Sequence, residues 1–125
     1  MKKVLVIDDN EQLNKLLTNK LKTSGYSVKQ ATNGEDALVV FEQFSPDLII
    51  TDVLMPDGDG MEFLASVKER HQGMKFKILA ISGGGHLNAA TYLGWMQTFG
   101  ADSVLEKPFK LTDLMDQVEG LTDVK

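Results

Sequence analysis

The sequence contains no cysteine, and only three of its 125 residues are proline. Without cysteine the chain forms no disulfide bond, no thiolate metal site and no cysteine nucleophile. Long apolar runs are absent too: none approaches the roughly 18 residues that span a bilayer, and Val4–Ile7 is too short for the core of a signal peptide. We therefore expect a cytoplasmic location and no membrane insertion.

Basic residues are in the minority, with 13 Lys and Arg against 18 Asp and Glu and a net charge of −5. Such a balance repels a phosphate backbone, so direct binding of nucleic acid is disfavoured. Hydrophobic residues make up 42% of the chain and charged residues 25%, as in an ordinary soluble globular domain. The length suits one core, and we interpret residues 1–125 as a single domain.

Short apolar runs alternate with amphipathic stretches five times along the chain. The runs "VLVI", "LII" and "ILAI" are continuously apolar, which is typical of strands covered by helices on both faces. Strands and helices alternating at this spacing favour a parallel sheet, so we predict an α/β three-layer sandwich of five strands and five helices. The expected strands are 3–7, 26–31, 47–51, 76–82 and 103–106. The expected helices lie between 10 and 25 and at 32–44, 61–70, 86–99 and 111–118.

Helix ends and buried faces are also marked. Asn10 and Asn33 stand where N-caps are expected, and Gly25 stands where the first helix should stop. Apolar residues at helical spacing predict the first helix and the inward face of the second helix. These residues are Leu13, Leu16, Leu17 and Leu21 in the first helix, and Ala37, Leu38, Phe41 and Phe44 in the second.

Polar side chains stand at the carboxyl ends of four predicted strands. Asp8 and Asp9 follow the first strand, Asp52 follows the third, Ser82 ends the fourth and Lys107 follows the fifth. Because ligands of open α/β sheets bind beyond the carboxyl ends of the strands, we predict that these side chains converge at one edge of the sheet.

Three clustered carboxylates repel one another, and a hard divalent cation such as Mg²⁺ relieves that repulsion through oxygen ligands. Asp52 could act as an oxygen nucleophile and form an acyl phosphate. The hydroxyl of Ser82 could donate a hydrogen bond to a phosphoryl oxygen, and Lys107 could neutralise its charge. The set indicates phosphoryl chemistry.

Four motifs, Ile7–Asp9, Thr51–Gly60, Ala80–Ser82 and Glu106–Phe109, resemble in order and spacing the receiver domain of bacterial two-component response regulators. The resemblance covers essentially the whole chain. It implies a flavodoxin-like doubly wound sheet with strand order 2-1-3-4-5. Because the sequence ends soon after the last expected helix, we expect no output domain in it.

The resemblance also implies roles and partners. A histidine kinase or phosphotransfer protein would donate the phosphoryl group, and a downstream protein or a second copy would bind the face formed by 86–99, 103–106 and 111–118. A cis bond before Pro108 is implied as well, because cis is cheap only before proline. The implied site residues are Asp52 as phosphoacceptor, Asp8, Asp9, Asp52 and the backbone carbonyl of Leu54 for Mg²⁺, and Ser82 and Lys107 for the phosphoryl group.

The sequence departs from the receiver pattern at Val104, where many members carry an aromatic residue whose rotation reports phosphorylation. A switch by aromatic rotation is therefore not expected. Tyr92, Trp95 and Phe99 fall at helical spacing within 86–99. Apolar residues on more than one side of a helix favour a wide core face; alternatively, the aromatic side docks a partner.

The implied function is a phosphorylation-dependent signalling switch that phosphorylates and dephosphorylates itself but turns over no external substrate, so we do not predict an enzyme. One alternative is a constitutive protein-binding module with this fold. Another is an aspartyl-phosphate phosphatase of the haloacid dehalogenase type, which carries a second aspartate two residues after the nucleophile. With Asp8 as nucleophile that place is held by Asn10, and with Asp52 it is held by Leu54, so neither frame fits.

Overall fold

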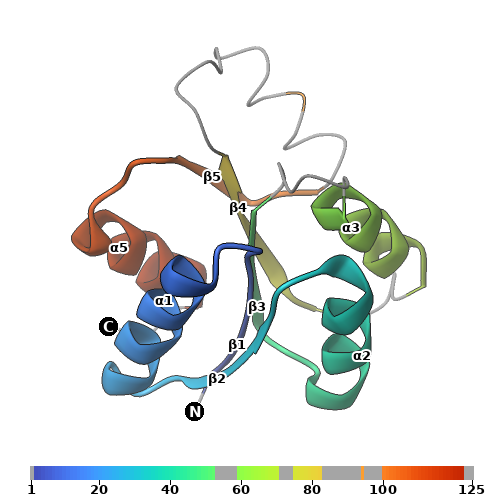
Figure 1. The fold of residues 1–125 in the computed structure, drawn as a ribbon, viewed down its shortest axis with the longest axis horizontal. Helices are drawn as coiled ribbons and strands as arrows, with labels where there is room; N and C mark the ends of the chain where they lie inside the picture. The colour runs from blue at the N-terminus through green and yellow to red at the C-terminus, as the bar shows by residue number, and fades with distance from the viewer. Residues whose placement is uncertain (1, 53–58, 71–74, 83–93, 95–99, 123–125) are drawn as a thin grey trace.

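The computed structural model describes residues 2–52, 59–70, 75–82, 94 and 100–122 (Figure 1). Strands and helices alternate through these segments. The strands are β1 (Lys3–Ile7), β2 (Ser27–Ala31), β3 (Leu48–Asp52), β4 (Lys77–Ser82) and β5 (Ser103–Glu106), and the helices are α1 (Glu11–Thr23), α2 (Gly34–Phe44), α3 (Asp59–Arg70) and α5 (Leu111–Thr122).

The five strands form one parallel sheet in the order β2-β1-β3-β4-β5, which confirms the predicted fold. In Figure 1, α1 and α5 lie on one side of the sheet and α2 and α3 on the other. The described residues hold four helices of the expected five, because the helix expected at 86–99 lies outside them apart from Gly94. No helix in the described segments is long and apolar enough to cross a membrane.

Successive residues of β1 pack into opposite sides of the sheet. Val4 and Val6 belong to the core cluster that includes residues of α1 and α5. Leu5 and Ile7 belong to the cluster that includes residues of α2 and α3. All four are essentially buried, as expected for a central strand with helices on both faces.

Both predicted N-caps are confirmed. The side-chain oxygen of Asn10 accepts a hydrogen bond from the N–H of Leu13 at 3.1 Å, and that of Asn33 accepts one from the N–H of Asp36 at 2.8 Å. Such a cap stabilises a helix by about 1 kcal/mol. Gly25 adopts a φ of +100° just past the end of α1, a conformation that glycine takes without steric cost.

The helical spacing of the four leucines in α1 is confirmed, but not all of them face the core: the side chain of Leu16 is 50% exposed. Asn14 and Thr18 are buried on this helix beside Leu17 and Leu21. Hydrophobicity alone does not reveal this face, because its two polar side chains are buried together with their hydrogen-bond partners. In α2, Ala37 and Phe41 are fully buried, whereas Leu38 and Phe44 are half-buried.

Candidate functional site

Asp8 and Asp9 lie where β1 leaves the sheet, and their environments differ. Asp8 is 1% exposed, whereas Asp9 is exposed. One oxygen of the Asp8 carboxylate, Oδ1, accepts a hydrogen bond from the N–H of Asn10 at 2.9 Å. The loop before α1 therefore holds one carboxylate against the sheet and leaves the next one toward solvent.

Asp52 is the last residue of β3, and it is 5% exposed. On β1, Ile7 is the partner of the preceding residue, Thr51, so the end of β3 lies beside the loop that carries Asp8. On its other side, Asp52 pairs with Ile81 of β4, one residue before Ser82.

Lys107 links the carboxylates. Its Nζ lies 3.1 Å from Asp8 Oδ2 and 2.9 Å from Asp52 Oδ2, and its side chain is 24% exposed. The peptide bond from Lys107 to Pro108 is cis, as expected. The ammonium thus joins the carboxyl ends of β1 and β3 from the end of β5.

The three aspartates form a group that could hold a metal ion. One carboxylate oxygen from each of Asp8, Asp9 and Asp52 lies within 4.8 Å of the others. An all-oxygen donor set with a solvent-facing member suits a hard cation such as Mg²⁺, which keeps several waters as ligands. The predicted convergence of these side chains is confirmed, and the donor set fits the expected ion.

Ser82 contributes a buried hydroxyl at the end of β4. The residue is fully buried, and among the described residues its Oγ has no hydrogen-bond partner. A buried hydroxyl without a partner costs about 1–3 kcal/mol, so such groups usually serve a ligand or a function. The carboxyl end of β4 therefore presents a donor at the edge where Asp52 and Lys107 lie.

The charges in this site shift two pKa values. Burial raises the pKa of the Asp8 carboxyl above its ordinary 3.8; the Asn10 N–H and Lys107 oppose this rise, and the nearby Asp52 adds to it. Burial lowers the pKa of the Lys107 ammonium, but the hydrogen bond and charge of Asp52, and then those of Asp8, outweigh burial and raise this pKa above 10.5. The site thus favours cations over further negative charge.

Not every residue implied by the receiver resemblance can be placed. Val104 is half-buried and packs against the core cluster on the side of α2 and α3. The backbone carbonyl of Leu54 and the possible partner face of Tyr92, Trp95 and Phe99 lie outside the described residues.

A groove that sequence reasoning missed opens beside Lys107. It has a volume of about 710 Å³ and separates α1 from the segment that joins β5 to α5. Distant parts of the chain form it, so no local motif marks it, and the spacing of Leu16 in the sequence gave no sign that its side chain is exposed. Its lining, which we call the α1–β5 groove, is formed by Asn10, Gln12, Leu13, Leu16, Glu106, Lys107, Pro108, Phe109 and Leu111.

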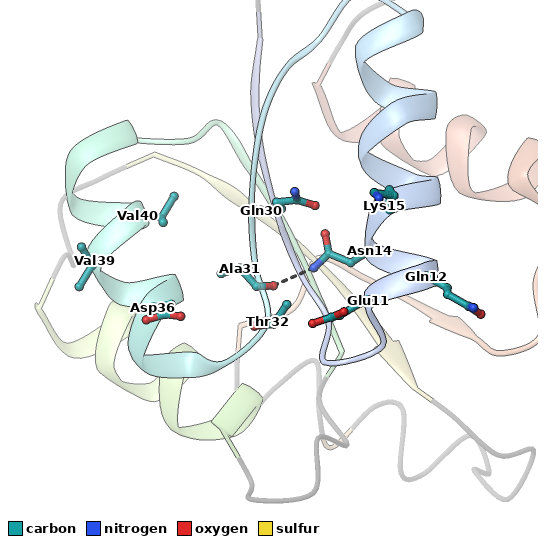
Figure 2. A pocket seen from close by; sticks show the side chains of 10 residues that line it. All are labelled: Glu11, Gln12, Asn14, Lys15, Gln30, Ala31, Thr32, Asp36, Val39 and Val40. Atoms are coloured by element: carbon teal, nitrogen blue, oxygen red, sulfur yellow. Dashed lines mark hydrogen bonds between the residues drawn. The ribbon is translucent and has the colours of Figure 1, made fainter.

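A second groove, of about 670 Å³, lies between α1 and α2 over the end of β2 (Figure 2). Asn14 of α1 lines it and reaches toward Ala31. Val39 is its exposed apolar residue, with 52% exposure. We call it the α1–α2 groove.

Residues 4–119 match the family model of the response regulator receiver domain. The alkaline phosphatase synthesis transcriptional regulatory protein PhoP of Bacillus subtilis is 37% identical over 96% of this chain and 48% of that protein. The chemotaxis protein CheY of Halobacterium salinarum is 29% identical over 94% of this chain and 93% of that protein. The chain spans about half the length of PhoP and of other transcriptional regulators that it matches.

Solved structures agree with these matches. The chemotaxis response regulator CheY4 of Vibrio cholerae has a TM-score of 0.84 and 29% identity, covering 97% of this chain and 98% of that one. The receiver domain of the Francisella response regulator 1452 has a TM-score of 0.85 and 25% identity, covering 98% of both chains. The similarity thus extends over the whole sheet and its helices.

Proposed function

This chain belongs to the response regulator receiver family, and from that premise we propose that it is a phosphorylation-dependent signalling switch in which Asp52 accepts the phosphoryl group. Receiver domains bind Mg²⁺ at an acidic pocket, interact with histidine kinases and downstream effectors, and are mostly not enzymes. Within this proposal the chain phosphorylates and dephosphorylates only itself. Its location is the cytoplasm, and its net charge of −5 supports a role without direct contact to nucleic acid.

One observation carries the proposal: a single ammonium, that of Lys107, lies within 3.1 Å of both the Asp8 and the Asp52 carboxylates. A purely structural ion pair needs only one partner. Two buried carboxylates around one lysine, with a third carboxylate within 4.8 Å, leave the group short of positive charge. That deficit suits a site completed by a divalent cation.

In the proposed transfer, a carboxylate oxygen of Asp52 attacks the phosphorus of a phosphohistidine. A phosphorus–oxygen bond forms, the phosphorus–nitrogen bond breaks, and the imidazole leaves with the electron pair and takes up a proton. When bound, Mg²⁺ neutralises charge on the phosphoryl oxygens. Asp8 and Asp9 would hold the ion, with Asp52 and the carbonyl of Leu54 as the further ligands.

Two other side chains have roles at the phosphoryl group. Lys107 moves from the Asp52 carboxylate to a phosphoryl oxygen and stabilises its charge. Ser82 donates a hydrogen bond to another oxygen, which gives its buried Oγ a partner. Water later attacks the acyl phosphate and releases inorganic phosphate, which resets the switch.

The phosphoryl donor is a histidine kinase or phosphotransfer protein. We place its docking site in the α1–β5 groove. The groove is lined by Leu13, Leu16 and Phe109 and includes Lys107, so a donor seated there stands beside the acceptor site. An exposed apolar residue such as Leu16 is typical of a surface that binds another protein.

The output face consists of 86–99, β5 and α5, and it binds a downstream protein or a second copy of the chain. The small, half-buried Val104 supports a switch that does not depend on aromatic rotation. Movement of Ser82 toward the phosphoryl group would instead pull on β4 and on the segment that follows it.

Acetyl phosphate with Mg²⁺, followed by intact-mass measurement, tests the proposal. We expect one phosphoryl adduct in the wild type and none in Asp52→Asn. Asp116→Asn removes an exposed carboxylate on α5 and should keep the adduct. Turnover of acetyl phosphate without an adduct would instead indicate a phosphatase, and neither turnover nor adduct would indicate a constitutive binding module.

A further inference from the structure

Asn14 is a buried polar residue on the face of α1 that packs against the sheet. Its side chain is essentially inaccessible, with 2% exposure. The side-chain nitrogen, Nδ2, donates two hydrogen bonds, to the backbone carbonyl of Asp8 at 3.1 Å and to that of Ala31 at 2.8 Å. Figure 2 shows the second of these across the α1–α2 groove. One amide group thus joins α1 to the ends of β1 and β2.

All four polar atoms of Asp8 are held. Its N–H donates to the Ala31 carbonyl at 3.2 Å, and its own carbonyl accepts from Asn14. Its carboxylate accepts from the Asn10 N–H through Oδ1 and from Lys107 through Oδ2. Among these contacts, Asn14 is the side chain that fixes the main chain of Asp8.

The Asn14 amide has one favourable orientation. Because Nδ2 faces two carbonyl oxygens, turning the amide over would place its own oxygen against both of them. In the observed orientation Oδ1 faces the hydroxyl of Thr18 at 3.3 Å. That hydroxyl also lies 3.2 Å from Oε1 of Gln30. The network therefore continues from the acidic loop through α1 to β2.

We propose that Asn14 is a positioning residue for the metal site, which holds the Asp8 carboxylate where it can bind Mg²⁺. This inference rests on the proposed function. Mg²⁺ requires nearly ideal octahedral geometry, so a ligand that shifts by a fraction of an ångström binds less well. A buried amide is costly unless its hydrogen bonds are made, and here both donors serve the acidic loop and its neighbour strand.

A matched pair of variants tests the inference. Asn14→Leu keeps the branching of the side chain at Cγ and removes both donors, whereas Thr18→Val removes the hydroxyl behind Asn14 and leaves both Nδ2 bonds. The Mg²⁺ dissociation constant is measured by calorimetric titration of the full chain with MgCl₂. We expect it to rise about tenfold in Asn14→Leu, the lower end of the effect of removing an outer-shell hydrogen bond, and to stay near wild type in Thr18→Val.

Amide hydrogen exchange without metal gives a second readout. The Asn10 N–H donates to the Asp8 carboxylate, so its protection should fall in Asn14→Leu more than in Thr18→Val. Asn14→Ser retains one donor and should give an intermediate Mg²⁺ affinity. It replaces Asn14→Leu if that variant does not fold.

The outcomes separate the two proposals. If folded Asn14→Leu binds Mg²⁺ as tightly as Thr18→Val and the wild type, the inference is overturned and the proposed function stands. If the wild type binds Mg²⁺ and the two variants differ as expected, but no adduct forms on Asp52, the proposed function fails and the inference stands. A wild type that binds no Mg²⁺ overturns both.

Discussion

The backbone N–H of Lys107 donates a hydrogen bond to the backbone carbonyl of Ser82 at 2.7 Å. This bond continues the pairing of β4 with β5 by one step beyond the strand β5 itself. It places Lys107 directly beside Ser82, the residue of β4 that carries the buried hydroxyl. The cation and the hydroxyl that serve the site are therefore fixed by the same main-chain contact.

Replacing Lys107 with methionine should lower the free energy of unfolding at neutral pH in the absence of metal. The Asp8 and Asp52 carboxylates would then lie buried without their shared cation. Because the lysine side chain is partly exposed, we expect a loss of about 1–3 kcal/mol, below the 3–5 kcal/mol typical when one partner of a fully buried pair is removed. Urea denaturation in EDTA measures it.

The exposed Lys110 supplies the control, because Lys110→Met removes a lysine of the same loop away from the carboxylates. Mg²⁺ should stabilise Lys107→Met more than the wild type, since the ion replaces the lost charge. Equal stability of the two variants in EDTA would show that the ion pair contributes nothing to the fold.

The raised pKa of Asp8 predicts a pH-dependent gain from Asp8→Asn. A carboxyl whose pKa is higher in the folded state binds more protons when folded, so its ionisation lowers stability as pH rises through that folded value. In EDTA at pH 7, Asp8→Asn should therefore be more stable than the wild type. The difference should shrink as pH falls toward 3.8, where Asp8 is becoming protonated in both states.

Urea denaturation across this pH range gives the measurement, and Asp116→Asn on the exposed face of α5 gives the reference. A stability difference between Asp8→Asn and the wild type that stays constant from pH 7 into acid would contradict the assignment. So would a destabilised Asp8→Asn at pH 7, because the lysine pair would then outweigh burial.

Much of this fold could be predicted from the sequence. Asn10 and Asn33 follow apolar runs and precede periodic ones, so a local rule finds both caps. The convergence of Asp8, Asp52 and Lys107 was predicted as well, because parallel strands bring their carboxyl ends to one edge. The strand order was implied only by the resemblance to the receiver family.

Other features depend on contacts that sequence periodicity does not record. The helical spacing of Leu16 is typical of a core residue, but its side chain faces the α1–β5 groove. The distant residues around Phe109 complete this groove. A polar residue such as Asn14 is usually exposed on a helix, but here its amide is buried and donates hydrogen bonds to the carbonyls of Asp8 and Ala31. In both cases the partner comes from another part of the chain.

Ser82→Ala should affect stability and phosphorylation in opposite directions. Removing a buried hydroxyl that has no partner among the described residues relieves an unsatisfied group, so unphosphorylated Ser82→Ala should be as stable as the wild type or up to about 1 kcal/mol more stable. The rate of adduct formation from acetyl phosphate should fall, since the phosphoryl group loses a donor. Thermal denaturation and intact mass measure the two effects.

Thr51→Val is the matched control on the neighbouring strand. Its hydroxyl is buried like that of Ser82, but it donates to the Asp52 carbonyl at 3.2 Å. This variant should lose stability and keep a normal rate of adduct formation. If Ser82→Ala were destabilised as much as Thr51→Val, the Ser82 hydroxyl would have to be satisfied within the folded protein.

Leu16→Asp should weaken phosphorylation by a protein donor and leave phosphorylation by acetyl phosphate unchanged. The side chain is half exposed, so a charge there costs the fold little, but it would disrupt an apolar contact in the α1–β5 groove. Val39→Asp offers a close match, because Val39 is exposed to the same degree and lies in the α1–α2 groove instead. With a phosphorylated histidine kinase that serves the wild type, we expect about a tenfold slower transfer to Leu16→Asp, the size of one lost apolar contact at an interface. A slower transfer to Val39→Asp with normal transfer to Leu16→Asp would place the donor in the other groove, and equal rates in all three proteins would exclude both grooves as its docking site.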